Sequence, residues 1–359
     1  MGRSRNLNRE VWESSPFYGG EDVKTNPTSS TTEQEAIIDE IIAGSLQAQQ
    51  KTGPDLRQIH SKSHGLLWGE FIIEPNLPED LKVGLFKTPQ TYPAWIRFSS
   101  GGSPEKRGKF RSDSQPDVRG IAIKVMNVDG QKVLDDEEKT QDFILNNYPI
   151  FLTKDVRDYA DLSKAGSGEL TPERLEELGY AFAILQKIGS QKVGNPLLIQ
   201  YWSQAPFKFG SRIVKLSLKS QQPEQPPETL PESENYLRET LVKYLTEEGR
   251  EASFDFLIQF YVDDEKTPIE DHIQEWQEAD SPFIKVATVR IPSQKFDFEE
   301  RKRLDEGILF SPWHTLLEHE PVGSVNLSRK RLYSELAKYR REQIAQRLRE
   351  PQPYEAVED

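Results

Sequence analysis

The stretch FDFLIQFYV, residues 254–262, carries the clearest strand pattern in the chain. Every second side chain from Phe254 to Val262 is large and apolar, whereas Asp255 and Gln259 lie on the opposite side. Successive side chains of a strand point to opposite faces, so a period of two held over this length predicts an antiparallel strand with at least one buried face.

Short apolar runs separated by turn residues lie on both sides of this stretch and predict further strands. The strands predicted before it cover residues 66–73, 94–99, 120–128 and 142–151, and a second strand-rich block extends from 197 to 291. Within that block, residues 221–235 hold four prolines and several glutamates, which predicts an extended, solvated loop. Helices are predicted at 32–50, 156–163, 171–188, 236–248 and 327–349. Two blocks of short strands with peripheral helices favour the α+β class, as an antiparallel barrel or sandwich with added helices.

The last predicted helix, residues 327–349, is long and highly charged. Arg329, Tyr333, Leu336 and Arg340 follow one another at spacings of four, three and four residues. Those spacings place all four side chains on one helical face.

Composition restricts the classes of partner and cofactor. The 359 residues carry a formal net charge of −13, and no long basic block is present, which argues against nucleic acid and anionic membranes as partners. The absence of cysteine excludes disulfides, iron–sulfur clusters and thiolate-ligated haem. The polar N-terminus lacks the apolar core of a signal peptide, and no apolar run approaches the length of a membrane span. We therefore expect a cytoplasmic protein.

Histidines are few, and common catalytic motifs are missing. His60 and His64 have the spacing of two zinc ligands on one helix face, but HSKSHG lacks the glutamate of a zinc protease. His314 and His319 form a looser pair that suits capping or packing. Neither a GxSxG elbow, a phosphate-binding loop nor a GxGxxG fingerprint is present, which removes the common hydrolase, nucleotidase and dinucleotide-binding interpretations.

Five short motifs, each weak alone, occur together in a consistent order. They are RQIHSK at 57–62, WIRFS at 95–99, DVRGIAIK at 117–124, NNYPIF at 146–151 and RKRLY at 329–333. Together they resemble the segments that carry the distal histidine, the distal asparagine and the proximal tyrosine of the catalase superfamily. The dense part of the resemblance covers about residues 55–155, and the small catalase-related haem proteins, which lack the wrapping and flavodoxin-like domains, are the most similar members.

The resemblance implies a barrel that holds haem b, with a long C-terminal helix carrying the proximal tyrosine. It implies an N-terminal arm and helix at 1–52, a single haem-binding domain at 53–349 and a tail at 350–359. The residues implied on the distal side are His60, Asn147 and Ser99. The residues implied to hold the cofactor are Tyr333 as ligand to the haem iron, with Arg329, Arg57, Arg97 and Arg340.

The implied roles suit the chemistry of these residue types. A phenol has an ordinary pKa of about 10, so a tyrosinate ligand needs a nearby cation, and Arg329 lies one turn before Tyr333. His60 would move a proton between the two peroxide oxygens, Asn147 would donate a hydrogen bond to the peroxide, and Ser99 would fix the tautomer of His60. The planar guanidinium groups of Arg57, Arg97 and Arg340 suit the haem carboxylates.

The resemblance implies breakdown of hydrogen peroxide or of organic hydroperoxides as small-molecule substrates, and it leaves a homo-oligomer open. Ile59, apolar where related allene oxide synthases carry a hydroxyl residue, favours peroxide breakdown over rearrangement of a fatty-acid hydroperoxide. Leu152 replaces an aromatic residue of catalases and would admit a bulkier hydroperoxide. The alternatives are a fatty-acid hydroperoxide isomerase, a haem-binding protein without turnover, and a barrel that has lost haem.

Overall fold

A computed structural model describes residues 31–343, except for residues 54–55, 103, 105, 107, 136–138 and 167. The predicted arm at 1–30, the last part of the predicted C-terminal helix at 344–349 and the tail at 350–359 lie outside the described residues.

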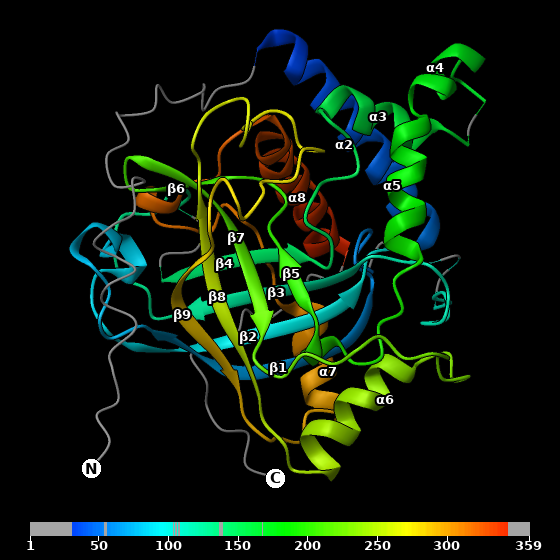
Figure 1. Ribbon diagram of the computed structural model, residues 1–359. Helices are drawn as coiled ribbons and strands as arrows, with labels where there is room; N and C mark the ends of the chain where they lie inside the picture. The colour runs from blue at the N-terminus through cyan, green and yellow to red at the C-terminus, as the bar shows by residue number, and fades with distance from the viewer. Residues whose placement is uncertain are drawn as a thin grey trace, which may run out of the picture.

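An antiparallel barrel forms the centre of the molecule (Figure 1). The strands follow the order β5-β4-β3-β2-β1-β9-β8-β7-β6, and a further pairing of β5 with β7 closes eight of them into a ring, leaving β6 on the side of β7. Their bounds are β1 Lys62–Ile73, β2 Thr91–Ser100, β3 Arg119–Met126, β4 Thr140–Asn146, β5 Gln200–Trp202, β6 Phe207–Phe209, β7 Arg212–Ser220, β8 Ala252–Phe260 and β9 Ile284–Ile291. The predicted α+β class with an antiparallel barrel is confirmed.

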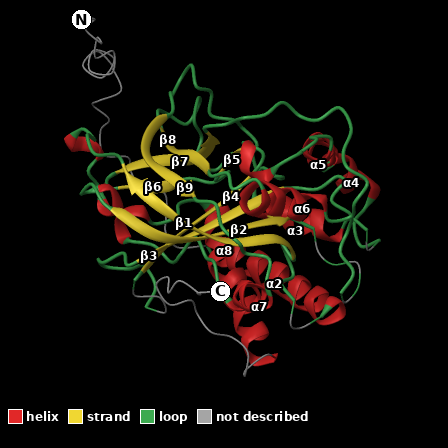
Figure 2. Ribbon diagram, turned by 90° about the horizontal axis from the view of Figure 1, so that it is seen from below, coloured by secondary structure: helices red, strands yellow, loops and turns green. Residues whose placement is uncertain are grey.

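Helices cover the outside of the barrel (Figure 2). Their bounds are α2 Thr32–Thr52, α3 Val156–Lys164, α4 Pro172–Glu177, α5 Gly179–Gly189, α6 Tyr236–Val242 with a π-helical turn Lys243–Glu247, α7 Glu299–Gly307 and α8 Ser324–Gln343. Short 3₁₀ segments occur at Glu79–Leu81, Gly84–Phe86, Pro196–Leu198 and Leu317–His319. Helix α2 packs against α3 and α8 on one side of the barrel, while α6 and α7 lie near β1 (Figure 1).

The barrel interior is filled by aromatic and branched side chains. Phe71, Phe143 and Phe256 come from three different strands, and their ring centroids lie 4.8 to 5.6 Å apart. The strand at 254–262 predicted from the alternation is β8, and its Phe254, Phe256 and Ile258 belong to this core. The side chains between these three on β8 point outward, as expected for a strand with one face on a core.

The clearest differences from the predicted bounds occur in three elements. The strand expected to continue to residue 151 ends at Asn146, because the Asn147 side chain accepts a hydrogen bond from the backbone N–H of Arg119 and the chain turns toward Pro149. The helix expected at 171–188 is two helices that meet at Leu178, directly before Gly179. The last helix begins at Ser324 rather than Leu327, since Gly323 adopts a left-handed φ of 89° and Glu270 accepts from the backbone N–H and hydroxyl of Ser324.

The aromatic core predicts a specific stability loss. Replacing Phe256 with Ala removes a fully buried ring that packs against three other core rings, and should lower the free energy of unfolding by about 3–5 kcal/mol. Phe182→Ala is the matched control, because Phe182 is 42% exposed and its loss should change stability by less than about 0.5 kcal/mol. Urea denaturation of both variants measures this; equal effects would contradict the assigned core.

Candidate active site

The strand register places three residues in one line on the outer wall of the barrel. Ser99 of β2 is paired with Gly120 of β3, and Gly120 is paired with Asn146 of β4. Paired residues of neighbouring strands point to the same side of a sheet. Because the flanking Phe98, Ile121 and Leu145 belong to the barrel core, Ser99, Gly120 and Asn146 lie on the outside.

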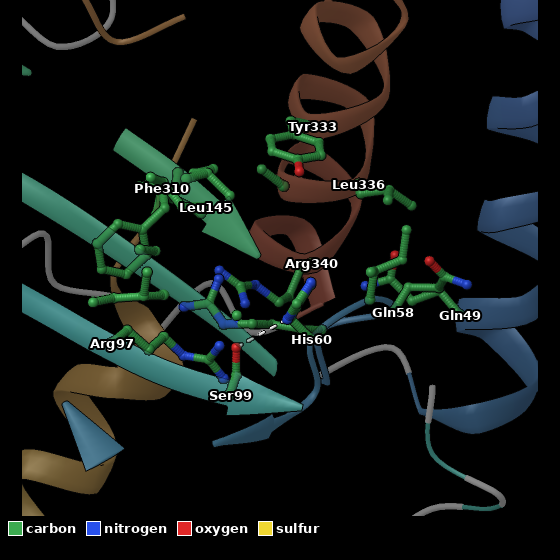
Figure 3. A pocket seen from close by; sticks show the side chains of 18 residues that line it. Gln49, Gln58, His60, Arg97, Ser99, Leu145, Phe310, Tyr333, Leu336 and Arg340 are labelled. Carbon is green, nitrogen blue, oxygen red and sulfur yellow. Dashed lines mark hydrogen bonds between the residues drawn. The ribbon is translucent and has the colours of Figure 1, made fainter. Parts of the chain in front are cut away.

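His60 lies directly against this wall, just before β1. Its backbone has an unusual left-handed φ of 55°, and its backbone N–H donates to the carbonyl of Gly101 at 3.2 Å. Its Nδ1 lies 3.0 Å from the Ser99 hydroxyl, which is the contact marked in Figure 3. A Cβ atom at position 120 would lie 2.4 Å from Cε1 of His60, so only glycine leaves room for the ring. Left-handed backbone at a non-glycine residue is typical of functional sites that the surrounding structure constrains.

The surroundings of His60 keep its ring uncharged. Burial, followed by the positive charges of Arg97, Arg329 and Arg57, lowers the pKa of His60 to about 3. The ring retains some exposed surface, but it lines a cavity, so the protein surrounds it. At neutral pH the imidazole is therefore neutral and available to accept a proton.

Tyr333 of α8 lies across a cavity from His60 (Figure 3). Two adjoining cavities, of about 560 and 130 Å³, share Ile59, His60 and Tyr333 as lining residues. The larger one lies within the usual range of ligand pockets, roughly 300–1,000 Å³. The predicted helical face is confirmed in outline: Tyr333, Leu336 and Arg340 line the small cavity, and Arg329 and Tyr333 line the large one.

Arg329 is buried one turn before Tyr333. Its guanidinium Nη1 lies 3.3 Å from Oδ1 of Asn326, and its centre lies 5.5 Å from the centroid of the Phe151 ring. Both neighbours restrain the guanidinium at the wall of the large cavity, so a fixed positive charge lies close to the tyrosine.

Three further arginines line the small cavity: Arg57, Arg97 and Arg340. Arg57 donates to the carbonyls of Asp305 and Ile308, which ties it to the end of α7. Arg97 forms an ion pair with Asp305 at 2.6 Å, and Arg340 is 3% exposed. The structure therefore brings together three guanidinium groups that were widely separated in the sequence.

Asn147 does not reach either cavity. Its Nδ2 donates to Gln191 Oε1 at 3.0 Å, and its Oδ1 accepts from the Arg119 backbone, so both ends of its amide are held by the surrounding loops. The asparagine that lines the large cavity is Asn146, one residue earlier than predicted. The reason is the register, since the residue paired with Gly120 must point to the same side as Ser99.

Two other lining residues were not identified from the sequence. Gln204 lies at the large cavity beside Asn146, and Tyr159 of α3 lines the same cavity, where burial and then the nearby Tyr333 raise its pKa. Tyr159 belongs to none of the motifs, and Gln204 lies in PLLIQYWSQAPFKFGS at 196–211, a stretch that resembles the small catalase-related haem proteins but to which the sequence assigned no role. For Tyr159, the amphipathic pattern of residues 156–164 is a sequence signal, because it predicts a helix with one face packed against the protein.

The remaining histidines have other positions. His64 points to Ser100 at 2.9 Å, His314 to Asp142 at 3.0 Å, and Nε2 of His319 accepts from the Leu85 backbone at 3.1 Å. Across the described ranges, no group of three or more His, Cys, Asp or Glu side chains could hold a metal ion. The zinc interpretation of His60 and His64 therefore finds no third ligand among those residues.

The residues at the cavities fit a flat, anionic cofactor with a metal centre. A phenol and a neutral imidazole lie on opposite sides, three arginines line one end, and the wall between Arg97 and Asn146 carries the small residues Gly120 and Ala122. The Oδ1 atom of Asn146 is buried, and no hydrogen-bond partner for it lies in the described parts of the chain. Buried polar atoms are normally paired, so this atom indicates space for a polar group.

Solved structures with a similar fold include catalases. A fungal catalase matches with a TM-score of 0.63 at 17% identity over 91% of this chain and 66% of its own. The chain has the catalase fold. A bacterial catalase matches with a TM-score of 0.63 at 18% identity over 99% of this chain and 70% of its own, and catalase A from Saccharomyces cerevisiae with 0.62 at 18% over 91% and 68%.

The chain spans 66% of the length of the fungal catalase, so part of that protein has no counterpart here. No protein-family model and no curated protein matches the sequence. Among the helices of the described residues, none has both the length and the apolarity needed to cross a membrane.

One buried histidine near the site predicts a pH dependence of stability. Burial, then Lys215 and Arg329, lowers the pKa of His272 to about 3, although Glu270 lies 3.8 Å from its Nε2. The Glu270 carboxylate is already bound to Ser324, so burial and the two cations dominate. Unfolded histidine takes up its proton near pH 6.5, so between pH 6.5 and 3 the unfolded state binds more protons and stability falls as the pH falls.

Replacing His272 with Phe removes this difference in proton binding. The slope of unfolding free energy against pH should become shallower by up to about 1.4 kcal/mol per pH unit below pH 6.5. Urea denaturation at pH 7.5, 6.5 and 5.5 measures the slope. If the new ring packs less well, stability falls equally at every pH, and the slope does not change. Equal slopes of unfolding free energy against pH for the two proteins would contradict the lowered pKa of His272.

Proposed function

We propose that this protein binds haem b through Tyr333 and uses it to break down hydrogen peroxide or organic hydroperoxides. The observation that carries the proposal is the placement of the Tyr333 phenol and the neutral His60 imidazole on opposite sides of one buried space. The catalase fold supports it, and so do the cationic residues around the space.

The proximal residues would hold the cofactor. Tyr333 would ligate the iron as a phenolate, and the buried guanidinium of Arg329, one turn earlier, would stabilise the negative charge. Arg57, Arg97 and Arg340 would bind the two carboxylates, since a planar fork of N–H donors matches a carboxylate. When bound, ferric haem would supply a redox-active metal that coordinates a peroxide oxygen.

The distal residues would handle the proton. His60, neutral and held by Ser99, would accept the proton from the near oxygen of the hydroperoxide and return it to the far oxygen, which then leaves as water or an alcohol. The amide of Asn146 would bind the hydroperoxide from the same wall. Asn147 has no part in this arrangement, because its amide is bound elsewhere.

The large cavity supports hydroperoxides bigger than hydrogen peroxide. Beyond His60 it continues along apolar side chains, including Phe151, Leu152, Leu185 and Ile188. The same apolar lining also favours a second candidate, rearrangement of a fatty-acid hydroperoxide. Incubation with a lipid hydroperoxide separates the two: reduction yields the alcohol and consumes an electron donor, whereas rearrangement needs no donor and yields an epoxide, either isomeric with the hydroperoxide or formed with loss of water.

The Tyr333→Phe variant tests the proposal. Haemin titrated into the wild-type protein should saturate at one equivalent per chain with a ferric, phenolate-type absorption spectrum. The variant should lose that spectrum, and peroxide-dependent oxidation of an electron donor should fall at least about tenfold, because removing the ligand oxygen removes the stabilisation of the ferric iron.

Tyr339→Phe is the matched control, since Tyr339 lies on the same helix but does not line either cavity. It should keep the wild-type spectrum and activity. A wild-type protein that binds no haem, or a Tyr333→Phe variant with an unchanged spectrum, would overturn the proposal.

A further inference from the structure

Gln204 occupies a constrained turn beside the large cavity. It lies between β5 and β6, is 3% exposed and has a left-handed φ of 63°. The neighbouring Ser203 secures the turn: its hydroxyl donates to the Ala205 carbonyl at 2.8 Å and accepts from the Leu216 backbone N–H at 3.0 Å. Left-handed backbone is disfavoured for a residue with a Cβ atom, so the fold holds Gln204 in this conformation at some cost.

The hydrogen bonds of Gln204 define which way its amide faces. Nε2 donates to the carbonyls of Tyr148 at 3.2 Å and Ile150 at 2.7 Å. A backbone carbonyl only accepts, so the nitrogen must lie at that end of the amide. The oxygen Oε1 therefore faces Asn146, where it can only accept.

That orientation determines the orientation of the Asn146 amide in turn. Asn146 Nδ2 donates to Gln204 Oε1 at 2.9 Å, so the nitrogen is fixed toward Gln204. The second N–H of Nδ2 takes no part in this bond. Oδ1 is left buried and without a partner in the described parts of the chain, 3.3 Å from where a Cβ of residue 120 would lie, beside the His60 ring.

We infer that Gln204 is a positioning residue for the distal amide: it holds Asn146 in one orientation against the wall that carries His60 and Ser99. The inference rests on the proposed function for its chemical meaning. A freely rotating amide would present nitrogen or oxygen to a ligand at random. The Asn146 amide, held by Gln204, keeps its Nδ2 and Oδ1 atoms in fixed positions before the ligand binds. Preorganised donors contribute most in buried sites, because no reorganisation is needed when the ligand binds.

Gln204 also holds the loop that shapes the cavity. The carbonyls of Tyr148 and Ile150 that it binds flank Pro149 and lead directly to Phe151 and Leu152, which line the large cavity. A purely structural role in this loop is the alternative, so the variants must separate loop holding from amide positioning. Gln204→Leu removes both functions, whereas Gln204→Glu keeps an acceptor for Asn146 and loses the two N–H donors.

The first measurement uses the protein without haem. The side-chain amide signals of Asn146 in a ¹⁵N-labelled sample are identified by their loss in Asn146→Asp, and their exchange with solvent is compared among variants. We expect exchange at least about tenfold faster in Gln204→Leu, because the hydrogen bond to Oε1 is lost, and near the wild-type rate in Gln204→Glu. Unchanged exchange in Gln204→Leu, or equally fast exchange in Gln204→Glu, would overturn the inference.

The second measurement uses the haem-loaded protein and cyanide as the distal probe. Gln204→Leu should weaken cyanide binding about tenfold, as expected for a lost hydrogen bond to a charged ligand, and Gln204→Glu should bind nearly as the wild type does. In an Asn146→Ala background, Gln204→Leu should have no further effect, because it acts through Asn146. Additive effects of the two substitutions would overturn the inference.

Gln200→Leu is the matched control. Gln200 lies in β5, four residues before Gln204, and its amide donates to the Ser217 hydroxyl at 2.9 Å, whereas the amide of Gln204 accepts from Asn146. It should leave cyanide affinity and Asn146 exchange unchanged. Failure of the wild type to take up haem would overturn the proposed function, and the exchange measurement on the haem-free protein would still decide the role of Gln204.

Discussion

The contact of the His60 ring with the bare backbone at Gly120 is the constraint on which the site depends. The closed barrel turns its apolar side chains inward, so its outer wall offers the alternate positions of β2, β3 and β4. At Gly120 this wall has no side chain, and the imidazole lies where a Cβ atom would otherwise be. Ser99 on one neighbouring strand and Asn146 on the other then lie on either side of the ring. Barrel closure thus fixes the distal side of the cavity.

The helices provide the opposite side of the cavity, and α8 carries two of the four arginines. Helix α8 carries Tyr333 with Arg329 and Arg340, and it is held in place by α2 and α3. Within the described ranges, Asp305 is paired with one of the cavity arginines, Arg97. Concentrating guanidinium groups around a buried space is unfavourable unless anionic groups compensate them. Burial keeps the His60 ring neutral, and the positive charges of Arg97, Arg329 and Arg57 lower its pKa further.

Local sequence patterns predicted most of the strands and helices and the face of α8, because alternation and helical spacing reflect burial directly, but they did not predict α7. They could not distinguish Asn146 from Asn147, since adjacent residues point to opposite sides and only the pairing with Gly120 decides between them. No local pattern assigned a role to Gln204 either, because its position depends on a left-handed turn and on carbonyls about 55 residues away in the chain. The break between α4 and α5 at Leu178 shows the same limit, as an apolar periodicity continued across it.

We propose that one cofactor lies between Tyr333 and His60. A crystal structure of the protein loaded with haem, with the iron located by its anomalous scattering, tests this most directly. We expect a single iron site per chain, bonded to the Tyr333 oxygen, with His60 on the opposite face and the haem carboxylates at Arg57, Arg97 and Arg340. Iron held by another residue, or a cavity that stays empty at saturating haem, would contradict it.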